Sequence, residues 1–141
     1  MSYASEPDLK DRLGGDLLAA LADENGDGAP DSTILQAALD DAAAEIDSTL
    51  AFRYAVPVNP APEILRRINA DLAAQFLFLR RREAISPEQL RRAAGARAQL
   101  LAWAEGRSDL DGASPRLRAF KTESLTREQE KLFDRETLEP Y

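Results

Sequence analysis

The 141-residue sequence contains no cysteine and no histidine. Without cysteine, the chain can form neither a disulfide framework nor a thiolate metal site. Without histidine, it lacks both the usual general base near neutral pH and the commonest ligand of transition metals. Carboxylates alone can still act as acids and bases, but these two absences argue against an enzyme. We therefore predict no catalytic residue, no bound metal and no cofactor.

Long apolar segments are missing as well. The sequence has no apolar run of about 18 residues, the length that a membrane-spanning helix requires. Its beginning, MSYASEPDLK, is polar and acidic, unlike the apolar centre of a secretory signal peptide. We expect no membrane span and no signal peptide, and a protein that is made and used in a cytoplasm.

The net charge of −7 is distributed unevenly along the chain. Residues 1–50 hold 12 acidic and 2 basic side chains, a net of −10, whereas residues 51–105 hold 9 arginines and 5 acids, a net of +4. The remaining residues 106–141 have a net charge of −1. An acidic half followed by a basic half allows ion pairing within one subunit or between neighbouring subunits of a ring. The overall negative charge argues against a simple nucleic-acid-binding protein.

Apolar residues recur with helical spacing along most of the chain, and no segment has a convincing strand pattern. We predict an all-α domain, a small bundle of about four helices with an extended C-terminal arm. The pair Gly14-Gly15 weakens the first helix, so we expect a bend or a break there. The four helices are expected from about Pro7 to Ala22, from Asp31 or Ser32 past Leu50, from about Pro62 to Arg82, and from Ser86 to Gly106.

Each predicted helix has an apolar face that we expect to point toward the core. Trp103, near the end of the fourth helix, is interpreted as a core or interface anchor rather than as part of a ligand pocket. The residues of the four faces are, in chain order, Leu9, Leu13, Leu17 and Leu21; Ile34, Leu35, Ala38, Leu39, Ala42, Ile46, Thr49 and Leu50; Leu65, Ile68, Leu72, Phe76 and Leu79; and Leu90, Ala94, Leu101 and Ala104.

The composition changes after Gly106. Residues 107–141 are polar, with single apolar side chains scattered among charged ones, and they cannot bury enough apolar surface to fold alone. Fully extended, this segment would span on the order of 100 Å. We therefore divide the chain into an α-helical domain, residues 1–106, and an extended C-terminal arm, residues 107–141, that docks on a partner. A solvated tail is the alternative.

The segment Asp23–Gly28 matches the first half of a calcium-binding loop, with oxygen ligands at positions one, three and five and glycine at six. The bidentate acid expected at position twelve is Ile34, and Pro30 stands where an apolar loop residue belongs. Asn-Gly and Asp-Gly also form ordinary turns. Strong calcium binding is therefore not expected.

Two arginine runs, Arg80–Arg82 and Arg91-Arg92, have the charge to contact nucleic-acid phosphates. Such runs more often complement the dipole at a helix C-terminus or pair with acids elsewhere in the chain. The acids Asp40-Asp41, Glu45 and Asp47 do not predict a catalytic carboxylate pair, because adjacent positions point to different faces of a helix. We interpret the acids as solvated surface charge and the arginines as helix-end charge or partners for acids.

Phe52-Arg53-Tyr54 stand at the end of the second predicted helix, directly before a proline-rich turn. A helix that ends on two aromatic rings and a cation must pack these large side chains against the rest of the chain or against another subunit. We expect Phe52 or Tyr54 to pack inward and Arg53 to bind an acid nearby or on the next subunit. These three residues are therefore predicted to form a subunit contact or a helix corner.

With these segments in place, the sequence resembles the small virion protein encoded among the head genes of Mu-like bacteriophages and prophages. The family pattern includes a loop rich in Asp and Gly, a helix that reads A-L-x-D-A-x-x-E-I-D-x-x-L, and an Arg-rich terminal segment with an aromatic end. The long segment Leu110–Thr126 departs from it. The matching segments here are Tyr3, Asp23–Gly28, Ala38–Leu50, Arg53-Tyr54, Val56-Pro57 and Leu132–Tyr141.

The resemblance implies a head–tail connector, also called an adaptor or head-completion protein, of a long-tailed phage. Proteins of that class form a homo-oligomeric ring, commonly dodecameric, between the portal protein and the tail-terminator or another neck protein. DNA passes through the ring without specific binding, and no membrane is involved. The protein would be made in the bacterial cytoplasm and reside at the neck of the virion. Its arm would dock on the portal or on a neighbouring subunit through Phe120, Phe133, Arg135, Leu138 and Tyr141.

Two other functions stay open at this point. One is a soluble regulatory module that binds a partner helix or calcium, and a rise in melting temperature on adding calcium would favour it. The other is a DNA-packaging accessory protein that binds DNA through its arginine runs, and salt-dependent retardation of DNA would favour it.

Overall fold

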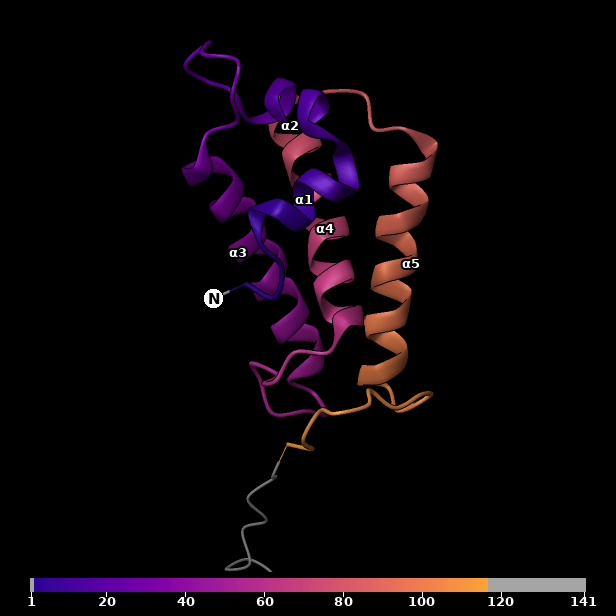
Figure 1. Ribbon diagram of the computed structural model, residues 1–141. Helices are drawn as coiled ribbons and strands as arrows, with labels where there is room; N and C mark the ends of the chain where they lie inside the picture. Colours follow the sequence, from indigo (N-terminus) through magenta and orange to yellow (C-terminus); the bar gives the residue numbers. More distant parts are fainter. Residues whose placement is uncertain (1, 117–141) are drawn as a thin grey trace, which may run out of the picture.

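The computed structural model describes residues 2–116, which form α-helices joined by turns and loops (Figure 1). Within this range there is no strand, only an isolated bridge between Tyr54 and Pro115, so the predicted all-α class is confirmed. No helix in the described range is both long and apolar enough to cross a membrane. The helices are α1 (Glu6–Leu13), α2 (Gly15–Ala22), α3 (Ser32–Leu50), α4 (Glu63–Arg81) and α5 (Pro87–Ala104).

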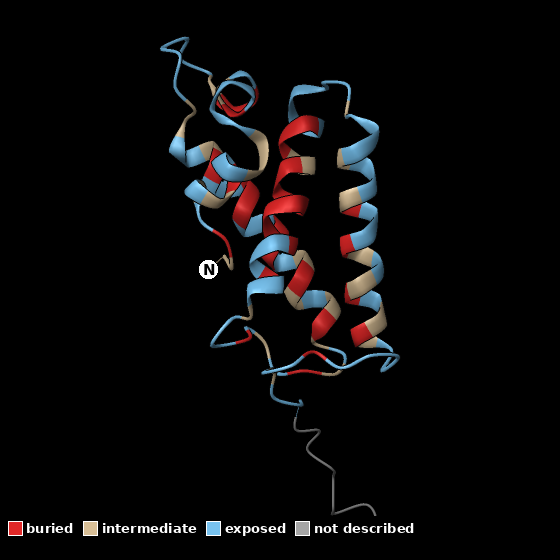
Figure 2. Ribbon diagram, turned by 45° about the vertical axis from the view of Figure 1, so that its right-hand side comes forward, coloured by how far each residue is buried: buried red, intermediate tan, exposed pale blue. Residues whose placement is uncertain are grey.

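The helices α3, α4 and α5 run side by side with α4 in the middle, and the short α1 and α2 lie across α3 and α4 (Figure 1). Because α4 has neighbours on most sides, it is buried along much of its length (Figure 2). The turn after α3 and the segment after α5 meet at one end of the bundle, while α2 and the α4–α5 connection lie at the other.

The first predicted helix is broken at Gly14, whose φ of 81° ends α1 and precedes α2. Such a φ favours glycine because a side chain would be strained there. The break also shifts the helical register, so the prediction that Leu17 faces the core is wrong. Leu18 is buried in α2, whereas Leu17 remains 39% exposed.

The predicted core faces need a larger correction in the last two helices. In α4, Leu79 is 56% exposed, although it was expected to face the core. In α5 the buried residues are not the predicted set, since Leu90 and Leu101 are 47% and 48% exposed. The core is instead formed by the other side of α5, where small side chains allow close packing against α4. The buried residues of α5 are Ala93, Ala96, Leu100 and Trp103.

The N-terminal segment is fixed to the bundle by a buried amide. The Oδ1 atom of Asn69 on α4 accepts hydrogen bonds from the backbone N–H groups of Tyr3, at 2.8 Å, and Ala4, at 2.7 Å. Its Nδ2 donates to the carbonyl of Leu39 on α3, at 3.0 Å. Asn69 is fully buried, so one side chain joins α3, α4 and the start of the chain.

The hydroxyl of Tyr3 makes a second connection. It donates to Asp47 on α3 and accepts from the backbone N–H of Val58 at 3.0 Å. Burial raises the pKa of Tyr3 to about 12, and the hydrogen bond to the Asp47 carboxylate acts in the same direction. The protonated phenol is therefore the form that the folded chain favours.

Replacing Tyr3 with phenylalanine should lower the free energy of unfolding by about 1 to 2 kcal/mol, because the ring remains while both hydrogen bonds are lost. The phenol stabilises the fold fully below its unfolded pKa of 10.0, and this contribution is lost as the pH rises through about 12. Urea unfolding of both proteins across this range should therefore show the difference shrinking above pH 10. A difference that is independent of pH would contradict the assignment.

Candidate functional site

The candidate site is the corner that follows α3. The chain turns directly after the helix, where the N–H groups of Arg53 and Tyr54 both donate to the carbonyl of Leu50, at 3.0 and 2.7 Å. Tyr54 is buried with 5% of its surface exposed, whereas Phe52 is 75% exposed. One of the two aromatic residues was expected to pack inward, and the structure assigns this position to Tyr54.

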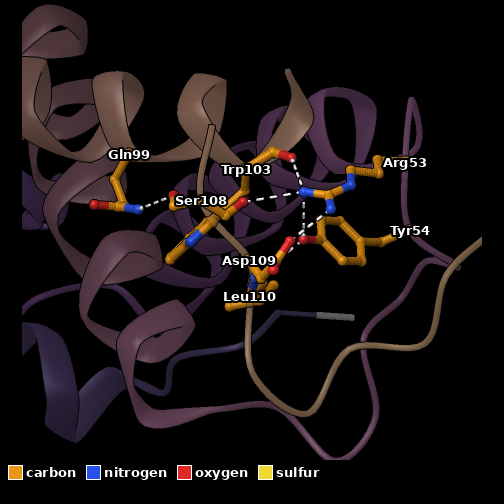
Figure 3. A network of polar contacts seen from close by, with 7 residues as sticks. All are labelled: Arg53, Tyr54, Gln99, Trp103, Ser108, Asp109 and Leu110. Carbon is orange, nitrogen blue, oxygen red and sulfur yellow. Dashed lines mark hydrogen bonds and ion pairs between the residues drawn. The ribbon is translucent and has the colours of Figure 1, made fainter. Parts of the chain in front are cut away.

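Arg53 lies at the centre of a polar network (Figure 3). Its guanidinium donates to the carbonyls of Trp103, at 3.2 Å, and Ser108, at 3.0 Å, and to the Tyr54 hydroxyl at 3.2 Å. It also forms an ion pair with Asp109 at 2.5 Å. A cation is favourable here because the carbonyl of Trp103 belongs to the C-terminal turn of α5. Arg53 thus finds its acid within the same chain and joins the end of α3 to the end of α5.

The first part of the predicted arm, residues 107–116, packs against this corner. Leu110 is buried, and its N–H donates to the Tyr54 hydroxyl at 3.0 Å. The N–H of Ala55 donates to the carbonyl of Ser114 at 2.9 Å. The sequence showed only a polar segment after Gly106, but its described part is held to the helical domain by backbone and side-chain contacts.

Replacing Arg53 with methionine should lower the free energy of unfolding by about 2 kcal/mol, since the carbonyls of Trp103 and Ser108 lose a charged donor. The loss should be local, so backbone amides of residues 107–116 should exchange with deuterium faster than those of α4. Arg107→Met, which removes an exposed arginine paired with Glu105, is the control and should change little. Equal exchange in both variants would mean that Arg53 does not hold the segment.

The proposed partner-binding residues of the arm lie outside the described part of the chain. This applies to Phe120, Phe133, Arg135, Leu138 and Tyr141. Their predicted role in docking stays a prediction. The described chain contributes the point from which the arm starts, which is the corner around Arg53 and Tyr54.

The loop Asp23–Gly28 forms turns stabilised by its own carboxylates. The two oxygens of Asp23 accept the N–H groups of Gly26, at 2.8 Å, and Gly28, at 2.9 Å. These bonds, chiefly that from Gly28, lower the pKa of the Asp23 carboxyl. Asp31 accepts from the N–H of Glu24 and the side chain of Asn25. Within residues 2–116, no group of three acidic side chains is arranged to hold a metal ion.

The arginine runs mostly contact the chain itself. Arg80 pairs with Glu24, and Arg81 donates to the carbonyls at the end of α2, that of Leu21 at 3.2 Å. Arg92 pairs with Glu88 one turn earlier in α5, at 2.5 Å. These contacts match the interpretation as charge that complements a helix end or pairs with acids, because the guanidinium groups bind carbonyls at the end of α2 and the carboxylates of Glu24 and Glu88.

Asp71 on α4 is a buried acid that the sequence pattern did not reveal. Its Oδ2 accepts a hydrogen bond from Arg12 of α1 at 2.9 Å. Burial raises the pKa of the Asp71 carboxyl, and the charge of Arg12 counteracts the effect. The pair fixes α1 against α4, so we assign it a structural role. The spacing of 59 residues between the partners explains why no local motif marked it.

Comparison with known proteins identifies the family to which this chain belongs. No curated protein matches the chain. The family model described as "Bacteriophage Mu, Gp36" matches residues 3–126, which include all five helices, the corner and the start of the arm. Because the match covers most of the sequence, the chain belongs to the bacteriophage Mu Gp36 family.

Proposed function

We propose that the chain is a head–tail connector of a long-tailed phage. Copies of it form a ring between the portal protein and the tail-terminator or another neck protein, and the C-terminal arm docks on the portal. The role is structural, without catalysis or a cofactor. The protein is then a component of the virion neck.

The observation that carries this proposal is the corner from which the arm starts. Residues 107–116 are fixed to the ends of α3 and α5 by Arg53, Tyr54 and Leu110. Because residues 107–116 are held in this way, docking of the arm would also fix the position of the helical domain. Membership of a phage family over residues 3–126 supports the same role.

Charge supports the proposed passage of DNA through the ring. The chain has a net charge of −7, and binding of duplex DNA depends on cations that neutralise phosphates. Three arginines with the potential to contact DNA, Arg80, Arg81 and Arg92, are engaged by acids or carbonyls of this chain. A ring of such subunits would let DNA pass without holding it.

The proposal is tested by deleting the gene from an inducible phage that carries it and supplying the protein from a plasmid. We expect the deletion lysate to contain DNA-filled heads and free tails that do not join, as seen by negative-stain electron microscopy. The plasmid copy should restore complete particles. Normal virions without the protein would refute the proposal, and empty heads would instead favour a role in DNA packaging.

A further inference from the structure

The helix α5 has a second apolar face on the outside of the bundle, where Figure 2 shows exposed residues along its length. Leu90 and Leu101 are 47% and 48% exposed, and Ala94 and Ala98 between them are also exposed. Positions separated by four, four and three residues lie on one side of a helix. These four residues, the α5 ridge, form a continuous apolar strip opposite the buried face, and such strips typically mark interaction sites.

An apolar groove lies between the first half of α3 and the second half of α4. It has a volume of about 550 Å³, and Ile34, Ala37, Phe76 and Leu79 line it from the two helices. Leu79 is 56% exposed although the rest of α4 is largely buried. A helix that presents leucine and alanine side chains is the kind of convex surface that binds in a groove between two helices.

The charges beside these two surfaces are opposite. Arg91 follows the first leucine of the α5 ridge, and Asp41 lies at the edge of the groove. Both are exposed, and among the described residues neither has an ion pair. The other charged residue of the groove, Arg80, is neutralised by Glu24. The groove therefore presents a net acidic edge to an incoming basic ridge.

We propose that the α5 ridge of one copy binds the α3–α4 groove of the next copy, with Arg91 facing Asp41. Because ridge and groove are different surfaces, each bound copy leaves one of the two free for a further copy, and the contact is head-to-tail. The inference rests on the proposed function in one respect, since a connector needs a closed ring. The contact itself is derived from α3, α4 and α5.

The absence of cysteine from the chain allows a direct test. Ala94→Cys on the ridge and Ala37→Cys in the groove are combined in one full-length protein, which is concentrated and treated with a short thiol-specific cross-linker. A gel should show a ladder of dimers, trimers and larger products. The matched control combines Ala94→Cys with Ala20→Cys, an exposed alanine of α2 outside the groove, and should run as a single uncross-linked band on the denaturing gel.

The same cross-linking is applied to purified virions that carry the double variant. A ladder from either preparation that is missing in the control supports the contact. Products that stop at dimers overturn the head-to-tail arrangement, and the lack of any product in both preparations overturns the contact altogether. If virions prove not to contain the protein, the proposed function is wrong, and the gel of the concentrated protein alone decides the contact.

Charge reversal provides an independent measurement. Arg91→Glu and Asp41→Arg should each weaken self-association roughly tenfold in sedimentation velocity, because like charges then face each other. The double variant should restore association, whereas unchanged association in both single variants would overturn the pairing. Circular dichroism melting checks that each exposed substitution leaves the fold intact. The gene deletion tests the connector role separately, so a failed contact and a failed function are distinguishable.

Discussion

Replacing Asn69 with alanine is expected to lower the free energy of unfolding by about 4 kcal/mol, because a buried unpaired donor or acceptor costs about 1 to 3 kcal/mol. The substitution leaves the N–H groups of Tyr3 and Ala4 and the carbonyl of Leu39 without their partner. The site is fully buried, so the loss is not compensated by bulk water. Urea unfolding followed by circular dichroism measures the effect.

The matched control is Gln99→Ala, which removes an amide of similar chemistry. Its side chain makes an exposed hydrogen bond to Ser108 at 3.4 Å, so we expect a loss of less than about 0.5 kcal/mol. Hydrogen exchange adds a local readout, since the amides of Tyr3 and Ala4 should lose protection in Asn69→Ala before those of α4 do. A loss below about 1 kcal/mol for Asn69→Ala would mean that this amide does not organise the N-terminal segment.

The helices were predictable because their apolar periodicity and breakers are local. The break at Gly14 and the start of the last helix at Ser86, whose Oγ accepts from the N–H of Gln89 at 3.2 Å, lie where the sequence predicted them. In α5, the helix's own sequence does not determine which of its faces is buried. Leu90 and Leu101 lie on one apolar strip, but the neighbouring helices pack against the other apolar side, with Ala93 and Ala96. Hydrophobicity alone cannot distinguish a core face from an exposed strip when a helix has both.

The corner was predicted as a feature, but its contacts were not. The sequence indicated a buried aromatic and an acid for Arg53, yet the acid is Asp109, 56 residues further along. Asn69 lies within an otherwise helical apolar pattern, and its backbone partners are up to 66 residues away. Such pairs are determined by tertiary packing, and no spacing in the sequence encodes them. Sequence patterns therefore identified the elements of the site, while the connections between them required the fold.

Removal of the arm beyond Arg116 should abolish the production of infectious particles while leaving a folded bundle. A chain ending at Arg116 keeps Leu110, Ser108 and Asp109 in contact with the corner. A chain ending at Gly106 loses them. Burial of a leucine contributes about 2 kcal/mol and each hydrogen bond about 1 kcal/mol, so the shorter chain should be less stable by about 3 to 4 kcal/mol.

The two truncations separate stability from docking when they are supplied to the gene-deleted phage. If the arm docks on the portal, the chain of residues 1–116 should melt like the full-length protein and yet restore almost no infectious titre. Alanine substitutions in the full chain at Phe133 and Tyr141 should then reduce the titre without changing the melting temperature, because aromatic anchors carry much of the energy of such interfaces. A chain of residues 1–116 that restores full titre would refute docking through the arm. Failure of residues 1–106 alone would place the essential contact at the corner, since this chain differs from the longer truncation only in residues 107–116.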